Sequence, residues 1–352
     1  MDNLRDAHVD SAKGIGIILV VLGHVPYFEK SELAEVIYSF HMPLFFLLSG
    51  IYLNSNSSFF NFLSKKLDQL IKPYFMMVGA IVIFHTLQSF FGFFPVEKLP
   101  QLIVGKLYAV GETISWLGDD PFVQLWFLPT LFLVSLFVFL IVKFLQKLES
   151  NITQNQIMLL LLAVTFFFIS PFFLSFLSEN ASSIFFYRYN TLPWNFDLIF
   201  ITSAFYALGY ALRSQIKKLE INVVLILLSI SVLSFLYFNF DAVLVLNDRQ
   251  FGIAWVTLTE ALLGIYLTLA LSKSVGFYTK PNQILTYFGL RSLWIYLFHL
   301  IFMTLSIKFF SHFISNTPVL NFLGFVAGIL LPIILCEIYF KWKAIQECKS
   351  NL

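Results

Sequence analysis

The feature that most constrains this chain is a series of apolar runs, each about 20 residues long and bounded by polar segments. An apolar helix of about 20 residues is long enough to cross the hydrocarbon core of a bilayer. We place such helices near residues 12–28, 33–53, 73–93, 123–143, 157–177, 195–213, 221–239, 252–272, 287–309 and 321–341. The runs do not alternate strictly, as the strands of a membrane β-barrel would. The sequence therefore predicts an all-α, polytopic transmembrane helical bundle of about ten spans.

The composition supports lipid as the solvent of this chain. Of its 352 residues, 59% are hydrophobic and only 12% are charged, whereas a soluble domain has about 25% charged residues. So few charges cannot cover a globule of this size with polar surface, which excludes a soluble enzyme and a disordered chain. The net charge of +2 gives no argument for nucleic acid as a partner. Because no soluble segment or internal repeat interrupts the pattern, we expect one membrane-embedded domain over residues 1–352.

The distribution of basic residues favours one orientation. With the N-terminus inside, 16 of the 22 Lys and Arg residues fall in inner segments. These are Arg5, Lys13, Lys65, Lys66, Lys72, Lys143, Lys147, Arg213, Lys217, Lys218, Lys273, Lys280, Arg291, Lys341, Lys343 and Lys349. An excess of basic residues marks the cytoplasmic side of a membrane. We therefore expect both termini in the cytoplasm and loops over residues 93–122 and 178–194.

Two ionisable residues of the first predicted helix are candidates for a functional site. Ionisable side chains are costly inside a bilayer, so each one there suggests a function. Lys13 and His24 are 11 residues apart, which places them within about 20° of one helical face and about 16 Å apart along the axis. The structural alternatives are a snorkelling, positive-inside anchor for Lys13 and a hydrogen bond to a neighbouring helix for His24.

A second histidine is predicted near the first. His41 lies about 12 Å below the outer end of the second predicted helix, and His24 lies about 6 Å below the outer end of the first. Because the two helices are antiparallel neighbours, both imidazoles are expected at comparable depth, where they can line one cavity. Pro43 leaves a backbone carbonyl without its helical partner, and this carbonyl can line the same cavity.

Other membrane-embedded polar residues receive no assigned role. They are His85, Glu260, His299 and Glu337, with Asp197 and Arg291 near predicted helix ends. No metal is expected, because the chain has no H-E-x-x-H motif, and its two cysteines, Cys336 and Cys348, lack metal-site spacing.

Several sequence blocks resemble the integral-membrane acyltransferase 3 family, which includes polysaccharide O-acetyltransferases and fucose 4-O-acetylase-like proteins. The blocks are DSAKGIGIILVVLGH at 10–24, SFHMPLFFLLSGIYL at 39–53, LIKPYF at 70–75, LWFLPTLF at 125–132, the LPWNFDLIF to FYALGYALR stretch at 192–213, and RSLWIYLFHL at 291–300. Lys13 stands where many members have Arg. The Arg-x-x-Arg pattern that many members carry before the third block is reduced here to Lys65 and Lys66.

The resemblance implies transfer of an acetyl group from acetyl-CoA to a hydroxyl of a cell-surface glycan or its lipid-linked precursor. Histidine, with an ordinary pKa of about 6.5, suits the general base that such a transfer needs. We assign that role to His24, and His41 to stabilising the oxyanion, orienting the acceptor or relaying the acyl group. The phosphates of coenzyme A are expected to be attracted by inner-face lysines. These are Lys13, Lys65, Lys66 and Lys72.

Several alternatives remain open from sequence alone. The intramembrane His, Glu and Arg residues also fit a transporter or proton-coupled permease, and the chain can be a non-catalytic partner of a glycan-assembly complex. The acceptor can be a small molecule such as a free sugar or an amino acid, and the donor a longer acyl-CoA. The expected location is the bacterial cytoplasmic membrane, with multiple passes. The expected partners are membrane lipid, the acceptor, and either a second copy of the chain or a glycan-assembly protein.

Overall fold

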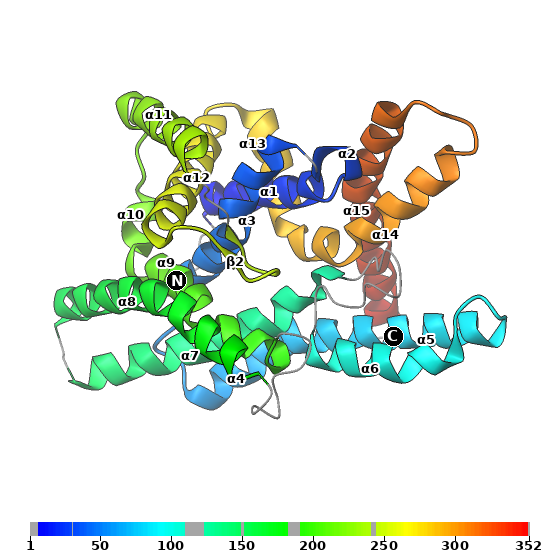
Figure 1. Cartoon of the computed structure of the whole chain (residues 1–352), viewed down its shortest axis with the longest axis horizontal. Coiled ribbons are helices and arrows are strands. Elements are labelled where there is room, and N and C mark those ends of the chain that lie inside the picture. The colour runs from blue at the N-terminus through cyan, green and yellow to red at the C-terminus, as the bar shows by residue number, and fades with distance from the viewer. Residues whose placement is uncertain are drawn as a thin grey trace. The chain divides into compact units, whose positions relative to one another are not determined.

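The computed structural model describes residues 6–29, 31–109, 123–148, 151–181, 191–240 and 244–350. These residues are almost entirely helical (Figure 1). The helices are α1 (Ala7–Gly23), α2 (Pro26–Glu29), α3 (Glu32–Ile51), α4 (Phe59–Lys66), α5 (Lys72–Phe90), α6 (Leu99–Tyr108), α7 (Phe127–Leu148), α8 (Ile152–Glu179), α9 (Ile199–Ala211), α10 (Arg213–Lys217), α11 (Val223–Asn239), α12 (Ala254–Val275), α13 (Thr279–Leu290), α14 (Ser292–Phe310) and α15 (Thr317–Ser350). A π-helical turn, η1 (Leu67–Ile71), joins α4 to α5, and the 3₁₀ turns are η2 (Val96–Lys98), η4 (Val123–Trp126) and η5 (Pro193–Leu198). Two short antiparallel strands, β1 (Leu244–Val245) and β2 (Gln250–Phe251), form a hairpin.

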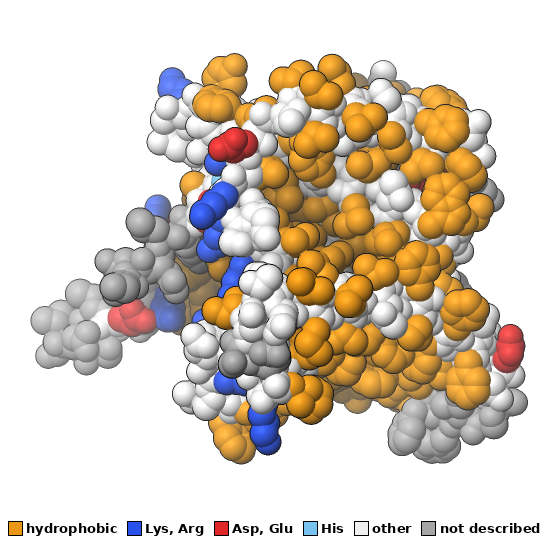
Figure 2. Space-filling model, turned by 90° about the vertical axis from the view of Figure 1, so that its left-hand side faces the viewer, with side chains coloured by type: hydrophobic (Ala, Val, Ile, Leu, Met, Phe, Trp, Pro, Cys, Tyr) orange, Lys and Arg blue, Asp and Glu red, His pale blue; other side chains and the backbone are white. Residues whose placement is uncertain are grey.

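Seven helical segments of the described residues are long and apolar enough to cross a membrane. They are Glu32–Ile51, Phe59–Phe90, Gln124–Leu148, Ile152–Glu179, Ala254–Val275, Ser292–Phe310 and Thr317–Glu347. Many large apolar side chains on them are exposed, and apolar side chains gather over one face of the molecule in Figure 2. The polytopic helical fold is therefore confirmed. The count of ten spans remains a prediction, because α1, α9 and α11 have only 17, 13 and 17 residues. The cytoplasmic location of both termini also remains a prediction.

The chain divides into two compact units that interleave in sequence. Unit 1 comprises Met1–His41, Lys217–Phe240 and Thr259–Leu352, and unit 2 comprises Met42–Ile216 and Asp241–Leu258. The single domain over residues 1–352 stays a prediction.

Unit 1 contains two close helix pairs. Helix α1 packs against α13 with almost no space between the backbones, because a Cβ atom at Gly289 would lie 1.8 Å from the carbonyl oxygen of Asp10. A Cβ atom at Gly14 would likewise lie 2.0 Å from the Leu285 carbonyl oxygen. Helices α14 and α15 lie side by side (Figure 1). Small residues at these crossings allow the backbone contact that membrane helices use for packing.

Unit 2 contains a similar crossing. A Cβ atom at Gly50 of α3 would lie 2.0 Å from the Tyr206 carbonyl oxygen, and one at Gly209 of α9 would lie 1.9 Å from the Leu47 carbonyl oxygen. Helix α9 also packs against α7 and α8. The two glycines thus fix how closely α3 and α9 approach.

Several helix ends differ from the predicted ones, and the predicted helix over residues 287–309 is divided at Arg291 into α13 and α14. The first helix starts at Ala7 and ends at Gly23 instead of continuing to residue 28. Proline disfavours the helical conformation of the residue before it, so Pro26 restarts the chain as the separate helix α2. The expected loop over residues 93–122 contains helix α6, although residues 110–122 lie outside the described part.

Candidate active site in unit 1

The first predicted site residue, His24, lies at the end of a helix. It is the C-terminal cap of α1, with φ −91° and ψ 4°, and its side chain is half-buried. The carbonyl oxygen of the preceding Gly23 accepts a hydrogen bond of 2.6 Å from the Tyr38 hydroxyl. This bond ties the end of α1 to α3, so His24 is held although it lies beyond the last helical residue.

His299 of α14 contacts His24. The two ring centroids are 5.3 Å apart, and the His299 side chain is fully buried. His299 Nδ1 lies 3.0 Å from the Ile295 carbonyl oxygen and 2.9 Å from that of Tyr296. Carbonyl oxygens only accept hydrogen bonds, so Nδ1 carries the proton and Nε2 of the neutral ring carries a lone pair. That Nε2 atom is buried and has no hydrogen-bond partner among the described residues.

His41 belongs to the same unit as these two histidines. It is buried, and its Nδ1 lies 2.8 Å from the Ile37 carbonyl oxygen, so the same argument assigns the proton to Nδ1 and the lone pair to Nε2. Its ring centroid is 5.2 Å from that of Tyr38. Tyr38 therefore connects the two predicted histidines, since its hydroxyl binds the residue before His24 and its ring contacts His41.

The site thus consists of three imidazoles and one phenol on α3, α14 and the end of α1. We refer to His24, Tyr38, His41 and His299 as the histidine cluster. A neutral imidazole with a free lone pair can take a proton from a hydroxyl, and its N–H form can donate to an oxyanion. The prediction that His24 and His41 carry catalysis remains a prediction. The sequence singled out no role for His299, whose one signal was a histidine inside an apolar helix.

The four predicted donor-binding lysines fall in different units. Lys13, in unit 1, is paired with the buried Asp10 carboxylate at 2.9 Å. Lys65, Lys66 and Lys72 belong to unit 2, where Lys65 and Lys72 are exposed and Lys66 is half-buried. Their role in donor binding stays a prediction.

Two of the unassigned polar residues form one ion pair. Arg291 Nη2 lies 2.8 Å from Glu337 Oε1, and the same oxygen accepts hydrogen bonds from Arg291 Nε at 2.9 Å and the Tyr287 hydroxyl at 2.8 Å. This group joins α13 and the start of α14 to α15. Glu260 is buried on α12, one turn before Gly264, whose backbone meets the Phe40 side chain. The expectation of no metal also stays a prediction: among the described residues, no three His, Cys, Asp or Glu side chains come together to hold one.

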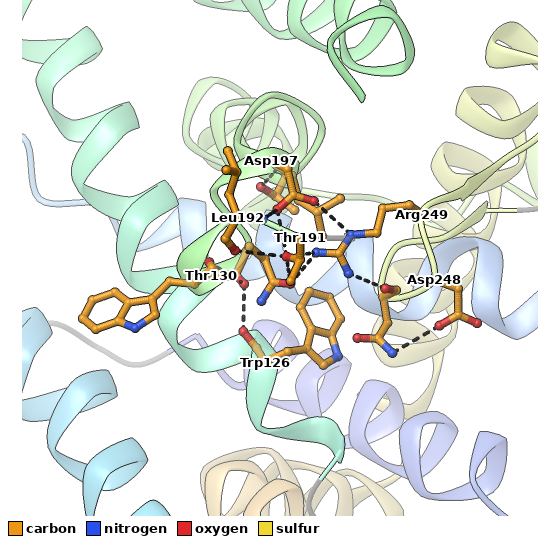
Figure 3. Close-up of polar contacts among 12 residues, drawn as sticks. Trp126, Thr130, Thr191, Leu192, Asp197, Asp248 and Arg249 are labelled. Carbon is orange, nitrogen blue, oxygen red and sulfur yellow. Dashed lines mark hydrogen bonds and ion pairs between the residues drawn. The ribbon is translucent and has the colours of Figure 1, made fainter. Parts of the chain in front are cut away.

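A second polar cluster lies in unit 2 (Figure 3). Arg249 Nε lies 2.9 Å from Asp197 Oδ2, and Arg249 Nη2 lies 2.6 Å from Thr191 Oγ1 and 2.5 Å from Asn195 Oδ1. Trp194, Asn195 and Arg249 all have positive φ values, of 59°, 55° and 55°. The side chain of Asp197 is fully buried. The Arg249 guanidinium thus joins Asp197, Thr191 and Asn195, and Asn195 Nδ2 also donates to the Ala109 carbonyl oxygen at 3.1 Å. We interpret the cluster as a clamp that holds strained loop backbone.

The fold and the histidine cluster define a polytopic helical membrane protein with titratable groups held in its interior. Comparison with known proteins gives the class of enzyme. A family described as an acyltransferase domain matches residues 6–337. The chain therefore belongs to this acyltransferase family, as its sequence blocks predicted, and the expectation of an acyltransferase enzyme is confirmed.

Two relatives match a shorter part of the chain, and both are called nodulation protein NolL. The protein from Mesorhizobium japonicum (strain LMG 29417 / CECT 9101 / MAFF 303099) is 34% identical over 121 residues, which cover 29% of this chain and 30% of the relative. The protein from Sinorhizobium fredii (strain NBRC 101917 / NGR234) is 38% identical over 104 residues, which cover 26% and 28%. The chain thus spans less than a third of the length of either relative. No solved structure gives a significant match.

Proposed function

We propose that this membrane acyltransferase moves an acetyl group from acetyl-CoA to a hydroxyl of a cell-surface glycan or its lipid-linked precursor, with His24 as the general base. The observation that carries the proposal is the contact between His24 and the buried, lone-pair-bearing ring of His299. A buried imidazole in contact with a half-buried one in an apolar helical unit is costly without a polar reaction to serve.

The proposed transfer uses His24 in both halves of the reaction. As the acceptor hydroxyl oxygen attacks the thioester carbonyl carbon, His24 takes the hydroxyl proton, and negative charge collects on the carbonyl oxygen. When the tetrahedral species collapses, the carbon–sulfur bond breaks and the coenzyme A thiolate recovers the proton. With its lone pair on Nε2, His41 orients the acceptor or relays the acyl group, and the relay would make a two-step route through an acyl-enzyme. The third predicted role, stabilising the oxyanion, requires a proton on Nε2, because the Nδ1 proton already bonds to the Ile37 carbonyl oxygen.

His299 acts in this proposal as a positioning residue. Its Nδ1–H group is held by two backbone carbonyls, so its Nε2 lone pair is fixed in direction. When that lone pair accepts the N–H of His24, the second His24 nitrogen is left as the base. This arrangement repeats the general rule that a catalytic base is oriented by a third group.

Donor and acceptor are proposed from the chemistry of the family resemblance and the charge pattern. Coenzyme A is an anionic, cytoplasmic donor, which inner-face lysines would attract. A glycan acceptor fits a bacterial cytoplasmic membrane enzyme that serves polysaccharide biosynthesis. A free sugar or another small hydroxyl or amino compound is the alternative acceptor, and a longer acyl-CoA the alternative donor.

The test compares His24→Gln with His312→Gln at matched protein levels. His312 is an exposed histidine after the end of α14, which makes it a control for loss of a histidine as such. Gln can form hydrogen bonds but cannot take the proton, and loss of a general base costs about 10²–10⁴ in rate. We expect His24→Gln to lose most O-acetylation of envelope glycan, measured by mass spectrometry, while His312→Gln keeps it. Near-normal acetylation in His24→Gln would refute the assignment of the base.

The positioning role of His299 requires its own readout. Loss of one aligned hydrogen bond is worth about 1 kcal/mol, or about fivefold in rate. His299→Phe should therefore lower kcat about fivefold or more and leave KM for acetyl-CoA unchanged. A raised KM with unchanged kcat would contradict the positioning role. Acetyl-CoA consumption in the same assay separates an enzyme from the transporter and the non-catalytic partner.

A further inference from the structure

A cavity of about 510 Å³ lies within unit 2 and is lined by both polar and apolar side chains. Its wall is formed by α7, the first turns of α8, the end of α9 and the first residue of α10, together with the turn after α3. Cavities of about 300–1,000 Å³ are typical of small-molecule sites. The apolar lining residues are Val142, Leu145, Ile152 and Leu159, and the other lining residues are polar.

The described residues that line this cavity include one cationic side chain and no acidic side chain. The cation is Arg213, which is half-buried, and its guanidinium carbon lies 4.1 Å from the centre of the Tyr210 ring. Stacking on an aromatic face fixes the plane of a guanidinium and leaves the N–H groups at its edge available. In the described part of the chain, no carboxylate lies within ion-pair distance of Arg213.

Neutral donors surround this cation. Ser55 Oγ accepts a hydrogen bond of 2.9 Å from the Tyr210 hydroxyl and one of 3.1 Å from Gln146 Nε2. With two bonds accepted, the Ser55 hydroxyl has its own proton to give to a ligand. Asn56 and Gln156 add amide groups to the wall. A planar cation with several N–H and O–H donors is the combination that recognises phosphate oxygens.

The backbone N–H groups at the N-terminus of α8 are not required for anion recognition in this cavity. The first backbone N–H groups of α8 that could face an anion, those of Thr153 and Gln154, already donate to the Asn151 side chain at 2.9 and 3.3 Å. Recognition therefore depends on Arg213 and the side-chain donors.

We propose that the unit 2 cavity binds the phosphate group of an amphiphilic ligand, with Arg213 as the principal contact. The apolar lining residues take the less polar part of the same molecule. Two sources share this chemistry: the phosphates of coenzyme A and the headgroup of an anionic phospholipid. Only the coenzyme A source depends on the proposed function.

The experiment measures binding by native mass spectrometry of the purified full-length protein in detergent. One arm adds coenzyme A, and the other adds phosphatidylglycerol. Arg213→Ala is compared with Lys218→Ala, which removes an exposed basic residue five positions further along the chain. We expect Arg213→Ala to weaken one of the two probes at least tenfold and Lys218→Ala to leave both unchanged. The probe that is lost identifies the source of the phosphate.

A second variant keeps the test decisive if Arg213→Ala does not fold. Asn56→Asp has nearly the same shape, lies at an exposed position of the cavity wall, and adds a negative charge that repels phosphate. It should weaken the same probe as Arg213→Ala, and Arg213→Lys should give an intermediate loss because an ammonium has no planar fork. Unchanged binding of both probes in Asn56→Asp and Arg213→Lys would overturn the proposal. Such a result would leave the His24 test untouched, because that test measures transfer.

Discussion

The clamp around Arg249 gives the sharpest stability prediction. Its guanidinium binds the Asp197 carboxylate at 2.9 Å and also the side-chain oxygens of Thr191 and Asn195 (Figure 3). The change to make is Arg249→Ala, which removes every one of these bonds at once. The carboxylate of Asp197, with 0% side-chain exposure, then remains buried without its cation.

The expected cost follows from this burial. Removing one partner of a buried ion pair typically costs about 3–5 kcal/mol, because an uncompensated charge remains. The Arg249 side chain is 17% exposed, so some water reaches the pair and we expect the lower end, about 3 kcal/mol. In proteins of 150–250 residues each kcal/mol shifts the unfolding temperature by about 2–4 °C. We therefore expect a decrease of roughly 5–10 °C in this somewhat larger chain.

Thermal unfolding of the purified protein in detergent is the assay, with three comparison variants. Gln250→Ala changes the exposed residue beside Arg249 and should leave the unfolding temperature unchanged. Arg249→Lys should recover only part of the loss, because a point charge cannot replace the planar fork. The double variant Asp197→Asn with Arg249→Ala should be destabilised less than the sum of the two single variants, because the residues are in contact.

The double variant also tests whether Asp197 and Arg249 interact energetically. Strict additivity would mean that the two side chains do not interact energetically. An unfolding temperature for Arg249→Ala equal to that of Gln250→Ala would refute the clamp.

Two further predictions concern helix packing and donor binding. Gly289→Ala should destabilise the protein by about 1–3 kcal/mol, because the new Cβ atom would lie 1.8 Å from the backbone oxygen of Asp10. Gly79→Ala, where a Cβ atom meets nothing within 4 Å, should be neutral or stabilising in the same thermal assay. Lys13→Ala should weaken the apparent affinity for acetyl-CoA, and Lys13→Arg should keep much of the activity in steady-state kinetics. Equal loss in both Lys13 variants with normal donor binding would instead assign Lys13 a geometric role.

Three features of the histidine cluster differ in how far the sequence predicts them. That His24 and His41 share a unit could be predicted, because the two helices are consecutive and antiparallel. The end of α1 at Gly23 has a local signal in Pro26, because proline disfavours the helical conformation of the residue before it. The contact of His24 with His299 had none, because it joins residues 275 positions apart and depends on how α14 is rotated about its axis.

The class of fold and the family can be predicted from the sequence alone. The length and hydrophobicity of a helix are local properties, because each side chain contributes its own free energy of transfer into lipid. Apolar runs of sufficient length therefore predict membrane helices however those helices pack together. The blocks around His24 and His41 predicted the acyltransferase family, and the match over residues 6–337 agrees.

The tertiary structure alone decided which polar side chains meet. Asp197 and Arg249 are 52 residues apart, and Arg291 and Glu337 are 46 apart. Hydropathy gives the depth of a residue along a helix but not the rotation or tilt of that helix, and a contact needs all three. The partners of His299, Arg249 and Arg213 are therefore set by packing between helices, where one wrong rotation would point the same side chain into lipid.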